Sequence, residues 1–422
     1  MYDLYKKVRG NSSRALIFLT GSVAAQGISA LTGLLLARWL AVSDYATYTI
    51  MITLIGAMSI LTKGGATFGY SAILGRVWPD RKLVSEAVLA VTNVRKKVSI
   101  FVLPFVIAST SFLLDRNEVS FIENFILCLF IVALWWADMK TSLVEQVLFY
   151  AKITTSIQVL DTFLSILRLI AISVIYLFSS IYILPVMLIS VLVASLRILP
   201  INKWAGEFLQ TRDVENNNSF TKEINGSVKK QLPVEIYYVF QAQIVLFCLS
   251  FFSNSQDVAG FGALGRIAQL LVPVTMFTYA FSIPIYTRAS ENVGRLLILF
   301  ILLSLAPGLF LLCISVFYPD MLLWLIGPNY SNMHNEIIWA VFATLISVTS
   351  GVFRNLVSSR GKMKYNFLQI PLGFLWVGIA VFLIDLSTII GAFQLQIGFA
   401  ICAIICGLID FFTGETKEKR SV

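Results

Sequence analysis

The chain has 422 residues, of which 58% are hydrophobic and 13% are charged, and its formal net charge is +9 at pH 7. Apolar stretches of about 20 residues recur along its whole length, and each can cross the roughly 30 Å hydrocarbon core of a bilayer as a helix. A soluble domain could not bury this much apolar helix. The composition therefore predicts an all-α, polytopic membrane protein.

The hydrophobic pattern predicts about twelve membrane-spanning helices. In chain order they cover 15–37, 45–62, 98–114, 121–142, 154–178, 184–200, 233–252, 259–285, 296–317, 335–356, 367–384 and 390–411. An even number of spans places both termini on the same side of the membrane.

The basic residues outside these spans indicate which side that is. Apart from Arg38 and Arg116, they fall in the two tails and in alternate loops. Basic loops are retained in the cytoplasm, so we predict cytoplasmic termini in a bacterial cytoplasmic (inner) membrane. This bias accounts for most of the net charge, so the basic composition does not indicate nucleic-acid binding.

A polar interior stretch at 201–232 divides the predicted spans six and six. A short internal echo agrees with this division, because SDYATY at 43–48 opens the second span and QDVAGF at 256–261 opens the eighth. Duplicated transporters show such weak internal symmetry. We predict an N-terminal six-helix bundle over 1–200, a cytoplasmic linker over 201–232 and a C-terminal bundle over 233–422, around a central cleft.

The chain offers no constellation for catalysis or metal binding. Its five cysteines lie in predicted spans without metal-ligand spacing, and its one histidine, His334, lies at the edge of a loop. The sequence also has no phosphate-binding loop of the kind that nucleotide-driven pumps carry. We therefore expect no metal, no cofactor and no enzymatic activity.

Four segments carry a family pattern in chain order. They are Ala37-Arg38-Trp39-Leu40 followed by the 43–48 motif, the eighth span from Val258 through Arg266 to Pro284, the stretch LIGPNY at 325–330, and SRGKMK at 359–364. This ordered set resembles polysaccharide-exporting flippases of the multidrug/oligosaccharidyl-lipid/polysaccharide superfamily. The resemblance implies a flippase that moves a saccharide on undecaprenyl pyrophosphate to the outer leaflet for O-antigen or capsule synthesis. It also implies other polysaccharide-assembly proteins as candidate partners.

Several cations lie inside predicted spans, where a charge costs at least a few kcal/mol unless it faces water or a partner. Guanidinium groups bind phosphate oxygens through paired, charge-assisted hydrogen bonds. We predict Arg266, which is flanked by small residues, as the main pyrophosphate anchor. Arg168, Arg38 and Lys140 are predicted as further substrate-binding cations. The alternative for each is a structural ion pair or a position at the membrane surface.

Two carboxylates, Asp161 and Asp138, are predicted as coupling residues or counter-ions. Asp161 and Arg168 share one helix face but lie about 10 Å apart along the axis, so each needs a separate partner. Asp138 and Lys140 project on different sides of their helix. Arg197 lies near a cytoplasmic helix end, where its side chain can extend to the membrane surface.

Two features near the second span allow two interpretations each. Gly64-Gly65 and Gly69 indicate either a hinge or a close helix contact. The basic stretch 76–97 is either an amphipathic segment on the anionic inner leaflet or a plain loop that sets the topology.

Two other functions remain as alternatives. An ion-coupled multidrug exporter would use Asp138 and Asp161 for a cationic cargo, although the charges within the predicted spans lean cationic. A membrane glycosyltransferase or O-antigen polymerase would need a substantial extramembrane loop, and the predicted outer loops are short. The sequence favours the flippase, working by alternating access of two bundles.

Overall fold

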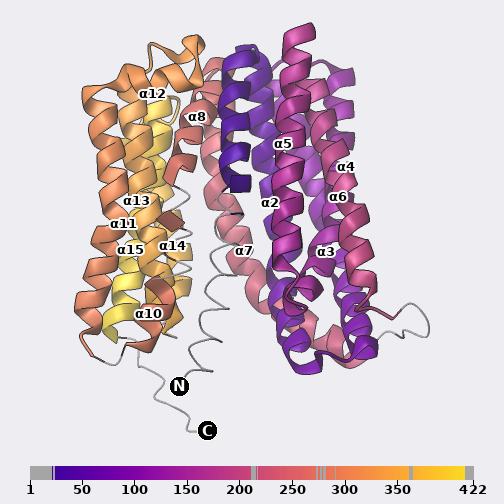
Figure 1. Ribbon diagram of the computed structural model, residues 1–422. Helices are drawn as coiled ribbons and strands as arrows, with labels where there is room; N and C mark the ends of the chain where they lie inside the picture. Colours follow the sequence, from indigo (N-terminus) through magenta and orange to yellow (C-terminus); the bar gives the residue numbers. More distant parts are fainter. Residues whose placement is uncertain are drawn as a thin grey trace, which may run out of the picture. The chain divides into compact units, whose positions relative to one another are not determined.

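In the computed structural model every regular element is a helix within the described residues (Figure 1). The structure describes residues 21, 24–210, 215, 217–271, 274–275, 278, 282–289, 291–360 and 365–413. The first helix covers residues 24–39 of this range. The predicted cytoplasmic tails lie largely outside it, and their orientation stays a prediction.

The later elements follow one another with short connections. They are α2 (Val42–Val77), α3 (Arg81–Arg116), α4 (Phe121–Tyr150), α5 (Thr154–Phe178), α6 (Ile183–Gly206), α7 (Asn218–Phe252), α8 (Ser255–Ile267), η1 (Ala268–Leu271), α10 (Ile283–Arg288), α11 (Val293–Phe317), α12 (Pro319–Ile326), η3 (Pro328–Tyr330), α13 (His334–Ser359), η4 (Asn366–Leu368), α14 (Gln369–Leu383) and α15 (Ile389–Thr413).

The predicted spans correspond to these helices. Among the described residues, nine helices are long and apolar enough to cross a membrane, namely α2 to α7, α11, α13 and α15. The other three predicted spans correspond, in their described parts, to the helix at 24–39, α8 with η1, and the shorter apolar helix α14; parts of 15–37 and 259–285 lie outside the described residues. The prediction of an all-α, multi-pass membrane protein is confirmed.

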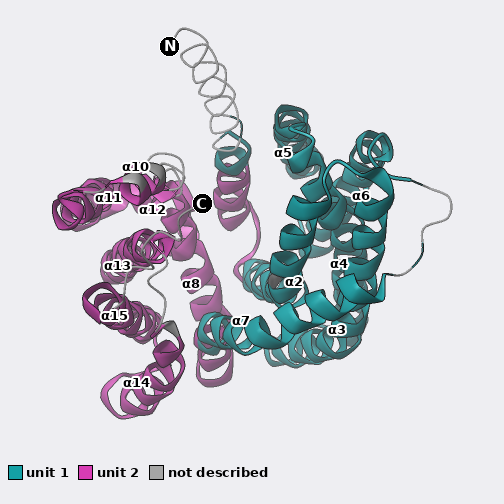
Figure 2. Ribbon diagram, turned by 90° about the horizontal axis from the view of Figure 1, so that it is seen from below, with its two compact units in different colours: residues 1–28, 43–244 teal, residues 29–42, 245–422 magenta. Residues whose placement is uncertain are grey.

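The chain divides into two compact units (Figure 2). Unit 1 consists of the described part of Met1–Ile28 together with Ser43–Ile244, and unit 2 of Ser29–Val42 and the described part of Val245–Val422. The predicted bounds 1–200, 201–232 and 233–422, which follow the polar stretch and the internal echo, divide the chain at other residues. From Asn218 onward the polar stretch is the start of α7 and belongs to unit 1.

Unit 1 contains helices that are longer than a bilayer requires. Helices α2 and α3 have 36 residues each and α7 has 35, so each is about 53 Å long against a hydrocarbon core of about 30 Å. Their surplus lies at one end, in residues 65–97 and 218–232, which we call the cap. A buried apolar cluster that includes Tyr70, Val94 and Ile224 fills it.

The basic stretch 76–97 is therefore mostly helix and not an extended loop. Asp80 begins α3 as its N-cap, since its carboxylate accepts hydrogen bonds from the backbone N–H of Lys82 at 2.9 Å and of Leu83 at 3.1 Å. The cap thus has its own helix-start signal and its own core.

The glycines of α2 make a close helix contact, which is one of the two predicted alternatives. A Cβ atom on Gly65 would lie 2.7 Å from the Cα atom of Val228, and one on Gly69 would lie 3.0 Å from the Cα atom of Ile224. Because these neighbours are backbone atoms, only glycine lets α2 and α7 approach this closely.

Unit 2 is built from helices that are just long enough to span. Helices α11, α13 and α15 have 25, 26 and 25 residues. Helix α13 packs against both α11 and α15, and α14 packs on α15. The Trp376 ring of α14 lies over Gly398 of α15, and its indole N–H donates to the Leu395 carbonyl at 3.0 Å.

Candidate functional site

The carboxylate of Asp138, on α4, is held by two cations of unit 1. Lys63 Nζ lies 2.5 Å from one of its oxygens, and Arg95 Nη2 lies 3.1 Å from the other. The Arg95 side chain is fully buried and also donates to the Thr62 carbonyl at 3.1 Å and to the Ser142 hydroxyl at 2.8 Å. Asp138 is thus a counter-ion within the protein, while its predicted part in coupling stays a prediction.

A second cluster joins α4, α5 and α6 through Arg197. Its Nε lies 2.7 Å from an Asp161 oxygen, and its Nη2 lies 3.0 Å from Glu145 and 3.2 Å from the other Asp161 oxygen. The three side chains are only 19 to 29% exposed. The interpretation of Arg197 as a helix-end residue that extends to the membrane surface is wrong, because the adjacent helices α4 and α5 present two carboxylates to it.

The two clusters balance in charge and share one helix. Together they contain three cations and three carboxylates from α2 to α6, and Asp138 and Glu145 lie seven residues apart on one face of α4. Such pairs add little net stability but are costly to break, because removing one partner leaves a desolvated charge. The clusters fix the arrangement of unit 1's helices.

Arg168 stands outside this balance. Its Nη2 donates to the Tyr48 hydroxyl at 3.4 Å, and its Nε is buried without a hydrogen-bond partner among the described residues. No carboxylate of the described chain forms an ion pair with it. Asp161 and Arg168 therefore do have separate partners, as their spacing predicts. A buried donor without an acceptor is unfavourable, and the predicted role of Arg168 as a substrate-binding cation stays a prediction.

Arg266, on α8, is half-buried and lies against the helix at 24–39. A Cβ atom on Gly33 would lie 3.1 Å from Arg266 Cδ and 3.2 Å from its Nε. The small residue that makes room for this side chain is therefore Gly33 of another helix, whereas Gly265 has open space beside it. The predicted role of Arg266 as a pyrophosphate anchor stays a prediction.

Arg38 and Lys140 are exposed and each lies near a tryptophan. Arg38 donates to the Trp324 carbonyl at 3.2 Å, and its guanidinium carbon lies 5.2 Å from the centroid of that ring. Lys140 Nζ lies 5.9 Å from the Trp136 ring centroid on its own helix, away from the Asp138 pair. Both contacts are cation–π interactions, and the predicted substrate contacts of both residues stay predictions.

Two of the family-like segments meet at Arg38. Gly327, in the 325–330 stretch, has a φ of +109°, and a Cβ atom there would lie 2.9 Å from Arg38 Cα. Both the backbone conformation and the close approach require glycine. The helix at 24–39 therefore contacts Arg266 through Gly33 and the 325–330 stretch through Arg38, all within unit 2.

Sequence reasoning missed the partners in unit 1. It gave no role to Lys63, Arg95 and Glu145, and it placed Arg197 at a helix end near the membrane surface. A usable signal was present, since opposite charges recur at similar depths on α4, α5 and α6. The described residues hold no group of three His, Cys, Asp or Glu side chains that could bind a metal ion.

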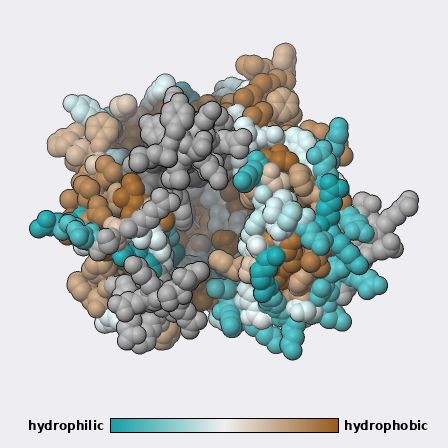
Figure 3. Space-filling model, turned by 60° about the horizontal axis from the view of Figure 1, so that its bottom comes forward, coloured by the Kyte–Doolittle hydropathy of each residue, from teal (hydrophilic) through white to brown (hydrophobic). Residues whose placement is uncertain are grey.

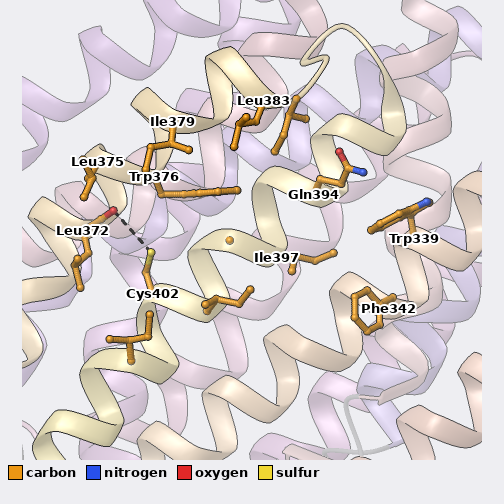
Figure 4. Close-up of a pocket in the computed structure, with 14 residues that line it drawn as sticks. Trp339, Phe342, Leu372, Leu375, Trp376, Ile379, Leu383, Gln394, Ile397 and Cys402 are labelled. Carbon is orange, nitrogen blue, oxygen red and sulfur yellow. Dashed lines mark hydrogen bonds between the residues drawn. The ribbon is translucent and has the colours of Figure 1, made fainter.

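A pocket of about 460 Å³ lies in unit 2 between α13, α14 and α15 (Figure 4). Its lining is apolar apart from Gln394, and Trp339 and Trp376 provide its aromatic surface. No charged side chain lines it, so it does not belong with the ionic contacts above.

Comparison with known proteins gives a fold. No family model matches the chain, and no curated protein matches it. A solved inward-facing conformation of a multidrug resistance MATE family transporter of the MOP superfamily is similar over 95% of this chain and 97% of that chain, with a TM-score of 0.61 and 12% identity.

Two further solved structures agree. An outward-facing conformation of a multidrug resistance MATE family transporter has a TM-score of 0.61 at 15% identity and covers 95% of this chain and 94% of that chain. A Vibrio cholerae MATE transporter has a TM-score of 0.57 at 13% identity and covers 95% and 96%. At these identities the likeness shows the fold alone: the chain has the fold of MATE transporters of the MOP superfamily.

Proposed function

We propose that this protein is a transporter that moves an undecaprenyl-pyrophosphate-linked oligosaccharide from the inner to the outer leaflet of the bacterial cytoplasmic membrane. It would serve surface polysaccharide synthesis, with both termini in the cytoplasm. The fold supports alternating access, because solved proteins of this fold carry names that describe inward-facing and outward-facing conformations.

The proposal rests on the incomplete hydrogen bonding of the Arg168 side chain. This guanidinium lies within an apolar helix, and among the described residues it makes a long hydrogen bond to Tyr48 while its buried Nε has no acceptor. Phosphate oxygens are the acceptors that guanidinium groups bind best. A pyrophosphate would satisfy the donors that the described protein leaves unbonded.

The carboxylates support an anionic cargo as well. Asp138 and Asp161, which a drug exporter would use for a cationic compound, already bind the protein's own Lys63, Arg95 and Arg197. A cationic cargo would have to displace these partners. The names of the structural neighbours favour the multidrug exporter as the second candidate, so the experiment must test both.

The test is complementation of a bacterium that lacks its lipid-linked oligosaccharide flippase, at matched expression. The wild type should restore surface polysaccharide, and Arg168→Ala and Arg266→Ala should abolish it. Arg168→Lys should restore little, because an ammonium group cannot form the paired hydrogen bonds. Arg116→Gln removes an arginine at the exposed end of α3 and serves as the matched control that keeps activity.

The same strains should be tested for resistance to cationic dyes and drugs. Wild-type drug export that needs Asp161 and is unaffected by Arg168→Ala would replace the flippase proposal with the exporter. Full polysaccharide export by Arg168→Ala would remove Arg168 from the site.

A further inference from the structure

Exposed apolar side chains mark where unit 1 leaves the hydrocarbon core. On α3, Ile100 and Phe101 are 66% and 80% exposed, whereas no large hydrophobic side chain is exposed within residues 69–99. On α7 the first such side chain is Ile236. On α2 the last such side chain is Phe68, which is 60% exposed and lies within the cap. Since exposed apolar side chains of a spanning helix face lipid, the part of α2 beyond Phe68 lies outside the hydrocarbon core, and on α3 and α7 the apolar surface begins at Ile100 and Ile236.

Two lysines of α3 lie directly at this boundary. Lys96 and Lys97 are exposed and precede Ile100 by about one helical turn. Their level along unit 1 is fixed by the neighbouring Arg95, whose Nε donates to the Thr62 carbonyl of α2 at 3.1 Å.

Two lysines of α7 lie at the same level. Lys229 and Lys230 are exposed, and Val228 beside them contacts Gly65 of α2. Gly65 is three residues from Thr62, or about 5 Å along α2. Two separate helices therefore each present a pair of exposed lysines at one level, where the apolar surface ends.

We propose that Lys96 and Lys97 of α3 together with Lys229 and Lys230 of α7 form a docking surface for the headgroups of anionic phospholipids. The surface complements a negatively charged headgroup layer, which attracts lysines that lie close to it. No carboxylate in the described chain forms an ion pair with these four lysines. Figure 3 shows many hydrophilic residues on the right of the face that comes forward.

The basic doublet at the other end of the cap provides a comparison on the same helix. Arg81 and Lys82 are also exposed, but they begin α3, 15 residues before the Lys96–Lys97 pair. The separation is about 22 Å along the helix, which exceeds the Debye length of about 10 Å at 0.1 M salt. The Lys96–Lys97 pair thus lies within reach of the headgroups, and the Arg81–Lys82 pair, which carries the same charge, lies beyond their reach.

The experiment is a titration of the purified full-length protein in neutral detergent with phosphatidylglycerol, and with phosphatidylcholine as the uncharged lipid. Binding is followed by native mass spectrometry and by the shift in thermal denaturation midpoint. The variants are Lys96→Gln/Lys97→Gln, Lys229→Gln/Lys230→Gln and the matched control Arg81→Gln/Lys82→Gln. Each lysine at a charged surface is worth about fivefold in affinity, so either lysine pair should cost roughly 30-fold.

The expected result is a preference for phosphatidylglycerol that falls with salt, falls in both lysine variants and persists in the Arg81→Gln/Lys82→Gln variant. Lys96→Arg/Lys97→Arg should keep it, because the charge is unchanged. An equal loss in the Arg81→Gln/Lys82→Gln variant would show a diffuse effect of net charge and overturn the docking surface. Equal binding of both lipids by the wild type would overturn it too.

Discussion

The two units reach stable packing among membrane-spanning helices in different ways. In unit 1 three helices of 35 or 36 residues extend into the cap, and six charged side chains from α2 to α6 are paired. In the described part of unit 2 the ion pair is His334 with Asp320, and both side chains are well exposed. Unit 2 relies on apolar contacts and on glycines that admit neighbouring side chains.

This difference shows what an intramembrane charge requires. A lone charge in a spanning helix is unfavourable by several kcal/mol, so unit 1 holds its charges in mutually neutralising clusters. Against this background Arg168 differs, because it is partly buried in unit 1 without a carboxylate partner among the described residues, whereas Lys140, which also forms no ion pair there, is exposed. The comparison therefore separates charges that stabilise the fold in ion pairs from Arg168, which forms no ion pair in the described part of the chain.

The largest effect on stability is expected from Arg197→Met in unit 1. The substitution leaves Glu145 and Asp161 without their shared cation, so we expect a loss of roughly 2–4 kcal/mol, because these side chains keep some exposure. The measurement is the thermal denaturation midpoint in detergent. Adding Glu145→Gln and Asp161→Asn should recover most of the loss, and a stable single variant would contradict the role of the cluster.

A smaller loss of stability is expected when alanine replaces a glycine whose neighbour is backbone and not a flexible side chain. Gly65→Ala places a Cβ atom 2.7 Å from the Val228 Cα atom, so we expect a loss of about 1–3 kcal/mol. Gly260→Ala in unit 2 meets the Cε atom of Met333, also at 2.7 Å, and this side chain can move aside. Equal midpoints for the two variants would remove this contrast between the units.

A still smaller effect on stability is expected for two exposed cation–π contacts, one taken from each unit. Arg38→Ala loses the contact with Trp324, and Lys140→Ala loses the contact with Trp136. Each contact at an exposed site contributes about 0.5–1 kcal/mol. Denaturation midpoints should therefore fall slightly in both variants, and a large fall in either would indicate a further structural role.

The smallest effect on stability is expected for Arg168→Met, although transport should be lost. The substitution removes a buried donor that has no acceptor in the described part of the chain, so the free energy of unfolding should change by less than about 1 kcal/mol or rise. Midpoint and complementation are measured on the same preparations. A destabilisation as large as that of Arg197→Met would place Arg168 among the structural charges.

The spans could be predicted from the sequence because membrane crossing is a local property. About 20 apolar residues are needed wherever the helix lies, and each predicted span has a helical counterpart. The sequence did not predict the structure of the segments that extend beyond the membrane. Residues 65–97 lie between two predicted spans, so hydropathy gave no sign that they continue α2 and α3 as a helical cap with its own core.

Spacing along one helix also gave correct local geometry. Asp161 and Arg168 have separate partners, as a distance of two helical turns requires. The same reasoning could not identify those partners, because they come from other helices. Arg197 is 36 residues from Asp161 in the chain and 52 from Glu145.

The sequence by itself determined that this protein is an all-α membrane protein, where its helices cross, and which of its residues are charged within them. Only the tertiary structure decided which charges neutralise one another, that Gly33 lies beside Arg266, and that Arg168 Nε is buried without an acceptor among the described residues. The physical reason is range: hydropathy acts residue by residue along a helix, whereas pairing depends on which helices are neighbours and at what level they meet.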